Sequence, residues 1–100
     1  MIALDRAKME SFCRKWKVRE LALFGSSLRD DFRADSDVDL LVTFTSDAEW
    51  SLLDHIRMEE ELTDMIGRKV DLVSRRAVER SANHIRRQAI LNSARVVYAA

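Results

Sequence analysis

The sequence predicts a single α/β (α+β) domain over residues 1–100, in which helices flank a small mixed β-sheet of about three or more strands. Three observations lead to this prediction. A chain of 100 residues can build one modest hydrophobic core but not two. Short apolar runs of strand length alternate with longer stretches whose apolar residues recur at helical spacing. Proline is absent and glycine occurs only at positions 25 and 67, so no linker or low-complexity segment divides the chain.

The first predicted elements are a helix over residues 3–16 and a strand over residues 19–24. The helix has Asp5 in its first turn, and its apolar residues recur every three or four positions. The strand contains the sequence LALF, which is too short for a helix and apolar on both faces. Such a run is typical of a central strand that is covered by helices on both sides.

The segment that follows combines a small-residue turn with a second strand. Gly25 and Ser26 come directly after the LALF run, and residues 25–36 form a loop too short for a full crossover helix. Residues 37–44 then form the second strand. Glycine allows the backbone to approach a phosphate group closely, and the N–H groups and hydroxyls that follow can bind phosphate oxygens.

The best-delimited element is a helix between two local signals. Ser46 and Glu49 have the spacing of a capping box, which predicts the start of the helix. Gly67 is a natural residue for its end, because glycine readily adopts the left-handed conformation found there. Downstream, the pattern predicts a strand over residues 69–74 and a last helix over residues 76–94. Residues 96–98 either extend this helix or form a packed tail.

Three carboxylates are the candidate catalytic and metal-binding residues. Asp37 and Asp39 are two apart in a strand, so they point to the same face with Cα atoms about 6–7 Å apart. Asp71 opens a similar apolar frame, DLVS against DLLV, and would join them if the two strands pair. A bare Asp-x-Asp is more often a simple strand start, but the apolar frames and the nearby Gly25 favour a site. Mutual repulsion of such carboxylates is removed by a divalent cation, and oxygen-only ligands favour Mg²⁺, with room for a second ion in two-metal phosphoryl transfer.

This pattern resembles the minimal nucleotidyltransferases of the DNA polymerase β-like superfamily. Their signature is Gly-Ser, an intervening loop, Asp-x-Asp and a third Asp on a later strand. The resemblance covers most of the chain, from LALFGSSLRDDFRADSDVDLLV through KVDLVS to a terminal helix with Asn83, Arg86 and Arg87. It implies the nucleotidyltransferase fold, with ATP as the nucleotide donor.

The resemblance also implies roles for individual residues. Gly25 and Ser26 would hold the triphosphate, with Ser27 and Arg29 assisting. Many members of the family have glycine after the loop arginine, whereas Asp30 stands here.

The three carboxylates receive their roles in the same way. Asp37 and Asp39 would bind Mg²⁺, and Asp71 would complete the metal site. Asp71 would also help to deprotonate the acceptor hydroxyl.

The expected acceptor lies on another protein. Only residues 72–100 follow Asp71, which leaves one helix and a tail where larger relatives have an acceptor-binding domain. Proteins of this size resemble the antitoxins of HEPN–nucleotidyltransferase toxin–antitoxin pairs. That resemblance implies transfer of AMP from ATP to a tyrosine of a HEPN ribonuclease toxin, within a hetero-oligomer.

Two alternatives stay open. A catalytically weak or inactive antitoxin would neutralise the toxin by direct binding, and Asp30 keeps this hypothesis open. The other alternative is nucleotidyl transfer to a small molecule or to RNA. The short C-terminal region and the zero net charge both argue against it. Lys+Arg and Asp+Glu each number 17, so the net charge is zero, and direct nucleic-acid binding is not expected.

The remaining candidates point to structure or stay undecided. The single cysteine, Cys13, excludes an internal disulfide and is expected to be packed rather than catalytic. No apolar run approaches the ~20 residues of a membrane span, so a cytoplasmic protein without membrane contact is expected. Trp16 and Trp50 are expected in the core, and both histidines are expected to be ordinary helix or surface residues. Several arginines either form a solvated helix face or contact phosphates or a partner: Arg75, Arg76, Arg80, Arg86 and Arg87.

Overall fold

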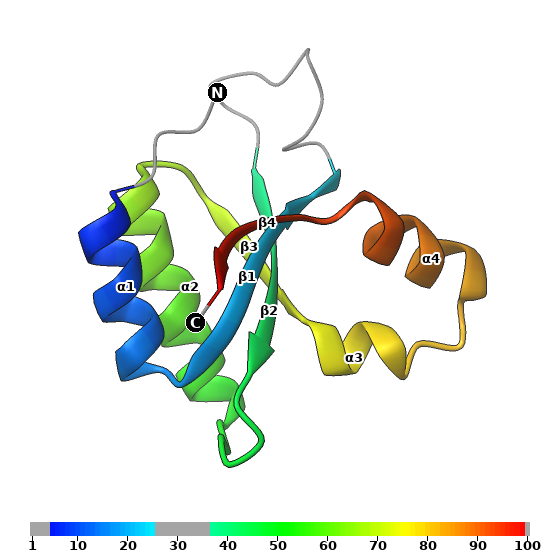
Figure 1. Ribbon diagram of the computed structural model, residues 1–100, viewed down its shortest axis with the longest axis horizontal. Coiled ribbons are helices and arrows are strands. Elements are labelled where there is room, and N and C mark those ends of the chain that lie inside the picture. The colour runs from blue at the N-terminus through cyan, green and yellow to red at the C-terminus, as the bar shows by residue number, and fades with distance from the viewer. Residues whose placement is uncertain (1–4, 26–36, 100) are drawn as a thin grey trace.

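The computed structural model describes residues 5–25 and 37–99, and its centre is a four-stranded sheet (Figure 1). The strands are β1 (Val18–Phe24), β2 (Val38–Phe44), β3 (Val70–Ser74) and β4 (Arg95–Ala99), in the order β3-β2-β1-β4. β1 is antiparallel to both of its neighbours, whereas β2 and β3 are parallel. The prediction of a mixed sheet flanked by helices is confirmed.

Helices cover both faces of the sheet. Figure 1 shows α1 (Arg6–Lys15) and α2 (Leu52–Ile66) on one face, and α3 (Arg75–Glu79) and α4 (His84–Ser93) on the other. Each face has its own core. We call the core under α1 and α2 the large core, with these buried residues: Met9, Phe12, Cys13, Trp16, Val18, Leu21, Val38, Leu40, Val42, Met58, Leu62, Val70 and Leu72. The small core lies under α3 and α4 and contains Ala22, Phe24, Leu41, Val78 and Ile90.

The first helix begins at Arg6 rather than at the predicted residue 3, and Asp5 precedes it instead of lying in its first turn. Asp5 is the N-cap of α1, and its carboxylate accepts hydrogen bonds from the backbone N–H groups of Ala7 and Lys8. These bonds satisfy donors that have no partner inside the helix. The predicted apolar stripe is confirmed from Met9 to Trp16, which are both buried.

The predicted start of the long helix was wrong. Ser51 and Asp54 form the capping box, and Ser46 and Glu49 do not. The reason is a tertiary contact: the indole N–H of Trp50 donates to the Trp16 carbonyl, 3.0 Å away.

The two indole rings also pack edge to face, with centroids 5.1 Å apart. These contacts between Trp50 and Trp16 hold the residues before Ser51 outside the helix, so that α2 begins at Leu52. The end of the helix is as predicted, since Gly67 closes it with a φ of 80°.

The C-terminal third differs most from the prediction. The single helix over residues 76–94 is divided into α3 and α4, because Asn83 caps a new helix by accepting from the backbone N–H of Arg86. Residues 96–98 do not extend the helix, and Val97 and Tyr98 pack against the large core, as the alternative of a packed tail predicts. They belong to β4, which pairs with the open edge of β1. None of the helices in residues 5–25 and 37–99 has the length and apolar character needed to cross a membrane.

Candidate functional site

Two of the three candidate carboxylates occupy directly adjacent positions in the sheet. Asp39 on β2 is paired in register with Asp71 on β3, which places their Cα atoms about 4.8 Å apart. Asp39 alternates with Val38 and Leu40 of the large core, so its side chain projects to the face of α3 and α4. Asp71 lies between Val70 and Leu72 of the same core and projects the same way. The strands pair as the sequence analysis required.

Gly25 brings a third part of the predicted site to the same place. It directly follows Phe24, the residue of β1 that pairs with Asp39. Its φ of +64° is a left-handed conformation that favours glycine. A Cβ atom at this position would lie 2.7 Å from Oδ2 of Asp39, well inside contact distance. A side chain here would therefore require the Asp39 carboxylate to shift, and the positive φ would strain any residue other than glycine.

Asp37 lies immediately before β2 and is exposed. The strand begins beside it, where the backbone N–H of Val38 donates to the Lys69 carbonyl at 2.8 Å. Within residues 5–25 and 37–99, no three His, Cys, Asp or Glu side chains are gathered in a way that could hold a metal ion. The structure thus makes Asp39 and Asp71 neighbours but does not bring Asp37 into a three-carboxylate cluster with them. Metal binding by the three residues stays a prediction.

The chemistry of the neighbouring pair nevertheless suits a divalent cation. Asp39 is half-buried and Asp71 is exposed, and both offer only oxygen ligands. Like charges on directly opposed strand positions are destabilising. A hard cation such as Mg²⁺ would offset this repulsion and is commonly held by one or two carboxylates together with substrate phosphates.

The remaining predicted phosphate-binding residues lie outside the described part of the chain. These are Ser26, Ser27 and Arg29, together with the unusual Asp30. Their roles stay predictions.

The C-terminal arginines have mixed roles. The guanidinium of Arg87 donates to the carbonyl oxygens of Glu79 and Ser81, at 3.3 and 3.4 Å, and so ties the end of α3 to the linker before α4. Arg75 forms ion pairs with Glu79 at 3.1 Å and Glu20 at 3.8 Å. Arg86 is exposed. Arg87 and Arg75 therefore have structural contacts within the chain: hydrogen bonds for Arg87 and ion pairs for Arg75.

Three polar residues of α2 were not recognised from the sequence. His55, Glu59 and Thr63 are half-buried and contact the backbone of β3 on both sides of Asp71. Their only sequence signal is a repeat of four residues on one helix face. His55, expected to be an ordinary residue, thus has a structural contact.

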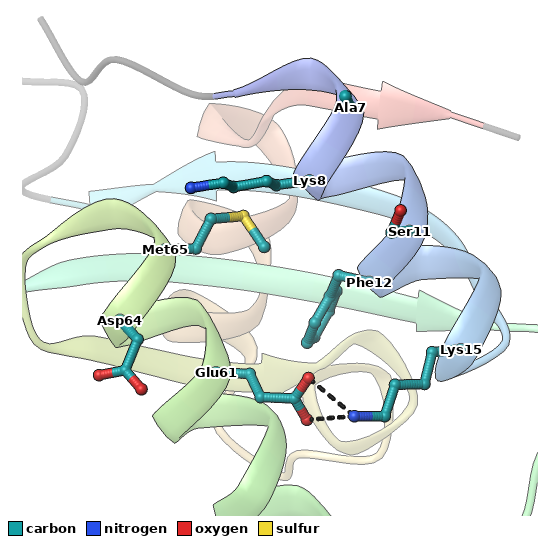
Figure 2. A pocket seen from close by; sticks show the side chains of 8 residues that line it. All are labelled: Ala7, Lys8, Ser11, Phe12, Lys15, Glu61, Asp64 and Met65. Carbon is teal, nitrogen blue, oxygen red and sulfur yellow. Dashed lines mark hydrogen bonds and ion pairs between the residues drawn. The ribbon is translucent and has the colours of Figure 1, made fainter.

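Two hollows lie away from the carboxylates. A groove of about 440 Å³ runs between α1 and α2, where Figure 2 shows Lys15 paired with Glu61 beside Phe12. A larger hollow of about 890 Å³ lies at the opposite end of β2 and β3, near Trp50 and Arg76. Among the described residues, neither hollow is lined by Gly25, Asp37, Asp39 or Asp71.

The single cysteine is not a candidate nucleophile. Cys13 is only 1% exposed, within the large core. Burial raises the pKa of its thiol to about 12, so the reactive thiolate is scarce at neutral pH.

Comparison with curated proteins finds relatives named as adenylyltransferases. Protein adenylyltransferase MntA of Thermococcus cleftensis is 42% identical over 65 residues, which cover 65% of this chain and 64% of that protein. A Methanocaldococcus jannaschii protein, MJ1217, named as a candidate protein adenylyltransferase, is 38% identical over 64 residues. The matched region covers 64% of this chain and 63% of that relative.

Solved structures share the fold. A structure named as a candidate minimal nucleotidyltransferase is 36% identical, with a TM-score of 0.64, over 89% of this chain and 88% of its own. A toxin–antitoxin complex with AMP-PNP contains a chain with a TM-score of 0.72 at 21% identity, covering 97% of this chain and 75% of that chain. A complex of tri-AMPylated Shewanella oneidensis HEPN toxin with MNT antitoxin gives a TM-score of 0.60 at 20% identity, over 94% and 69% of the two chains.

The sequence also matches the family described as the nucleotidyltransferase domain, and the match extends over residues 6–97. This range includes both strands that bear the paired aspartates and the glycine beside them. The chain belongs to the nucleotidyltransferase domain family.

Proposed function

We propose that this protein is a Mg²⁺-dependent nucleotidyltransferase that transfers AMP from ATP to a tyrosine of a HEPN ribonuclease toxin and thereby neutralises it. The observation that carries the proposal is the pairing of Asp39 with Asp71. Beside this pair lies Gly25, whose backbone conformation and closeness to Asp39 disfavour a side chain at that position. Phosphoryl transfer depends mainly on positioning and on neutralisation of negative charge, and this arrangement offers both.

In the proposed reaction, the tyrosine oxygen forms a bond to the α-phosphorus of ATP. The bond from that phosphorus to the bridging oxygen breaks, pyrophosphate leaves, and the tyrosine loses its proton. Gly25 allows the backbone to lie close to the triphosphate, with Ser26, Ser27 and Arg29 as further phosphate ligands. Asp71 would accept the tyrosine proton.

Asp37, Asp39 and Asp71 would hold the metal, with two Mg²⁺ ions as the proposed complement. Bound Mg²⁺ supplies charge neutralisation for phosphate oxygens and lowers the pKa of an attacking hydroxyl. All three are anionic oxygen donors, the kind of ligand that this ion prefers, and Asp39 and Asp71 project to the same face of the sheet.

The choice of a protein acceptor rests on the relatives. The curated relatives bear the name protein adenylyltransferase, and two of the structures with this fold are toxin–antitoxin complexes. One of these complexes contains AMP-PNP and the other an AMPylated HEPN toxin. A cytoplasmic hetero-oligomer with a HEPN toxin is therefore the setting we propose.

The proposal is tested by incubating the protein with ATP labelled in the adenine moiety, Mg²⁺ and the HEPN protein encoded beside it. We expect label to appear on a tyrosine of the HEPN protein and the ribonuclease activity to fall. The Asp39→Asn variant should transfer label at least ~100-fold more slowly, as expected when charge stabilisation of the transition state is lost. Asp64→Asn is the matched control, because Asp64 is exposed on α2, away from the paired carboxylates.

The same assay separates the proposal from a binding-only antitoxin. If Asp39→Asn neutralises the toxin as well as the unmodified protein and no label is transferred by either, direct binding is the function. Transfer to a small molecule or RNA, with none to the HEPN protein, would contradict the proposed acceptor.

A further inference from the structure

We infer that Glu59 and Thr63 of α2 are positioning residues, which hold β3 so that Asp71 stays opposite Asp39. The inference rests on the proposed function, because it concerns the geometry of the same carboxylate pair. It assigns a role to side chains that do not touch the substrate and lie on the opposite side of β3 from β2.

The contacts that carry the inference flank Asp71 in the chain. Oε2 of Glu59 accepts the backbone N–H of Leu72 at 2.8 Å. Oγ1 of Thr63 accepts the backbone N–H of Val70 at 3.1 Å. Asp71 is thus the residue between two anchored amides.

A third contact completes the arrangement. Nε2 of His55 lies 2.7 Å from the carbonyl oxygen of Leu72. A carbonyl oxygen only accepts, so Nε2 carries the hydrogen in this contact. Leu72 therefore has both of its backbone groups bonded to α2.

The spacing of the two elements explains why a helix can do this. Four residues of a helix advance about 6 Å, and two residues of a strand advance about 6.6 Å. Side chains at positions 59 and 63 can therefore reach N–H groups that are two residues apart in an extended chain. The helix runs antiparallel to β3, since Thr63 meets Val70 and Glu59 meets Leu72.

The strand order shows why β3 needs this support. β3 is the edge of the sheet, with β2 as its neighbour on one side. The pairing with β2 uses the groups of alternate residues, as shown by the bond from the Val38 N–H to the Lys69 carbonyl. The groups of Val70 and Leu72 point outward, where an edge strand normally exposes unpaired donors and acceptors.

The consequence for the site follows from the register. A strand that is fixed on both sides cannot slip or twist away from its neighbour, and a one-residue slip would turn Asp71 to the opposite face. Loss of the α2 contacts would leave β3 held by β2 alone. Asp71 would then spend less time opposite Asp39.

The test compares Glu59→Ala with Glu60→Ala, which removes the same charge from an exposed position of the same helix. Hydrogen exchange of the Leu72 amide measures how often the bond to Glu59 opens. Titration with Mn²⁺ alone measures the metal affinity of the carboxylate pair. For Glu59→Ala, we expect faster exchange, an about tenfold weaker Mn²⁺ affinity and an about tenfold lower kcat for AMP transfer. Glu60→Ala should match the unmodified protein in all three.

Conservative variants distinguish positioning from general destabilisation. Glu59→Gln keeps a carbonyl oxygen that can accept the Leu72 N–H, so it should restore Mn²⁺ affinity and kcat to within about twofold. Thr63→Val removes an acceptor at nearly constant volume and should weaken Mn²⁺ binding, while Thr63→Ser should not. These two pairs are informative even if Glu59→Ala does not fold.

Equal Mn²⁺ affinity and equal Leu72 exchange in the Glu59→Ala and Glu60→Ala proteins would overturn the inference. Weaker Mn²⁺ binding in Glu59→Ala, with no AMP transfer by the unmodified protein, would support the positioning role and contradict the proposed function. If the unmodified protein binds no Mn²⁺ even with ATP present, the proposed function is contradicted, and the hydrogen exchange of the Leu72 amide alone decides the positioning role.

Discussion

The two faces of the sheet divide the work of the molecule. Among residues 5–25 and 37–99, the large core, under α1 and α2, buries thirteen residues, including the fully buried Leu62, Met58 and Leu40. In the same part of the chain, the small core, under α3 and α4, buries five. Asp39 and Asp71 project to this second face, so the less extensively packed side of the sheet bears the candidate site. Apart from the polar contacts of α2 with β3, the difference suggests that stability and chemistry can be changed separately, and variants on each face test this separation.

The largest effect is expected in the large core. Leu62→Ala should lower the free energy of unfolding by about 3 kcal/mol, because Leu62 has no exposed surface and its removal leaves a cavity. Urea unfolding followed by circular dichroism measures this change. Where the variant is folded, AMP transfer should be nearly unchanged, and a selective loss of transfer at full stability would contradict the division.

A smaller effect on stability is expected in the small core. Ile90 is 8% exposed at the edge of that core, and Ile90→Ala should cost about 2 kcal/mol. Phe24 of the same core precedes Gly25 and pairs with Asp39, and Leu41 lies two residues beyond Asp39, so transfer should fall by more than in Leu62→Ala. The comparison would fail if the large-core variant lost more activity than this one at equal folded fraction.

The cap of α2 should contribute less than either core residue. Ser51→Ala removes the hydroxyl that accepts the Asp54 N–H, and it should cost about 1 kcal/mol. Ser46→Ala is the matched control, since the structure does not place Ser46 in a cap. Thermal unfolding of the two variants should show a lower Tm for Ser51→Ala alone. A lower Tm for Ser46→Ala alone would instead support the helix start predicted from the sequence.

The smallest expected effect is the pH dependence of stability that comes from Asp54, the acidic residue of the same capping box. Hydrogen bonds from the backbone N–H and hydroxyl of Ser51 hold the pKa of Asp54 below its ordinary value of 3.8. The ionised carboxylate therefore contributes stability that is fully present above pH 3.8 and is lost as the pH falls through the lower, folded pKa. Unfolding experiments between pH 2 and 7 should show a slightly steeper acid decline for the unmodified protein than for Asp54→Asn. If the free energy of unfolding falls equally with pH in both proteins, ionisation of Asp54 makes no contribution to stability.

Elements with local signals were predictable from the sequence. The strand before Gly25 and the end of α2 at Gly67 follow from short apolar runs and from the conformational freedom of glycine. The start of α2 was not predictable, because the competing capping box at Ser46 and Glu49 is overridden by the contact of Trp50 with Trp16. β4 was missed for a similar reason, since its partner β1 is distant in the sequence.

The candidate site shows the same limit. The spacing of Asp37 and Asp39 predicted a shared face, and Asp71 was expected to join them if the two strands pair. The structure pairs Asp39 with Asp71 but does not gather all three. The contacts of Glu59 and Thr63 with β3 could not be foreseen. They depend on how a helix packs along the edge of a sheet, which a pattern within either segment does not encode.

The central claim is that the carboxylates of adjacent strands serve AMP transfer. Its most direct measurement is the single-turnover rate of AMP transfer from ATP to the HEPN protein by Asp71→Asn, compared with Asp64→Asn. We expect Asp71→Asn to be at least ~100-fold slower than the control, with both proteins folded and bound to the HEPN protein. Rates within about twofold of each other would contradict the claim.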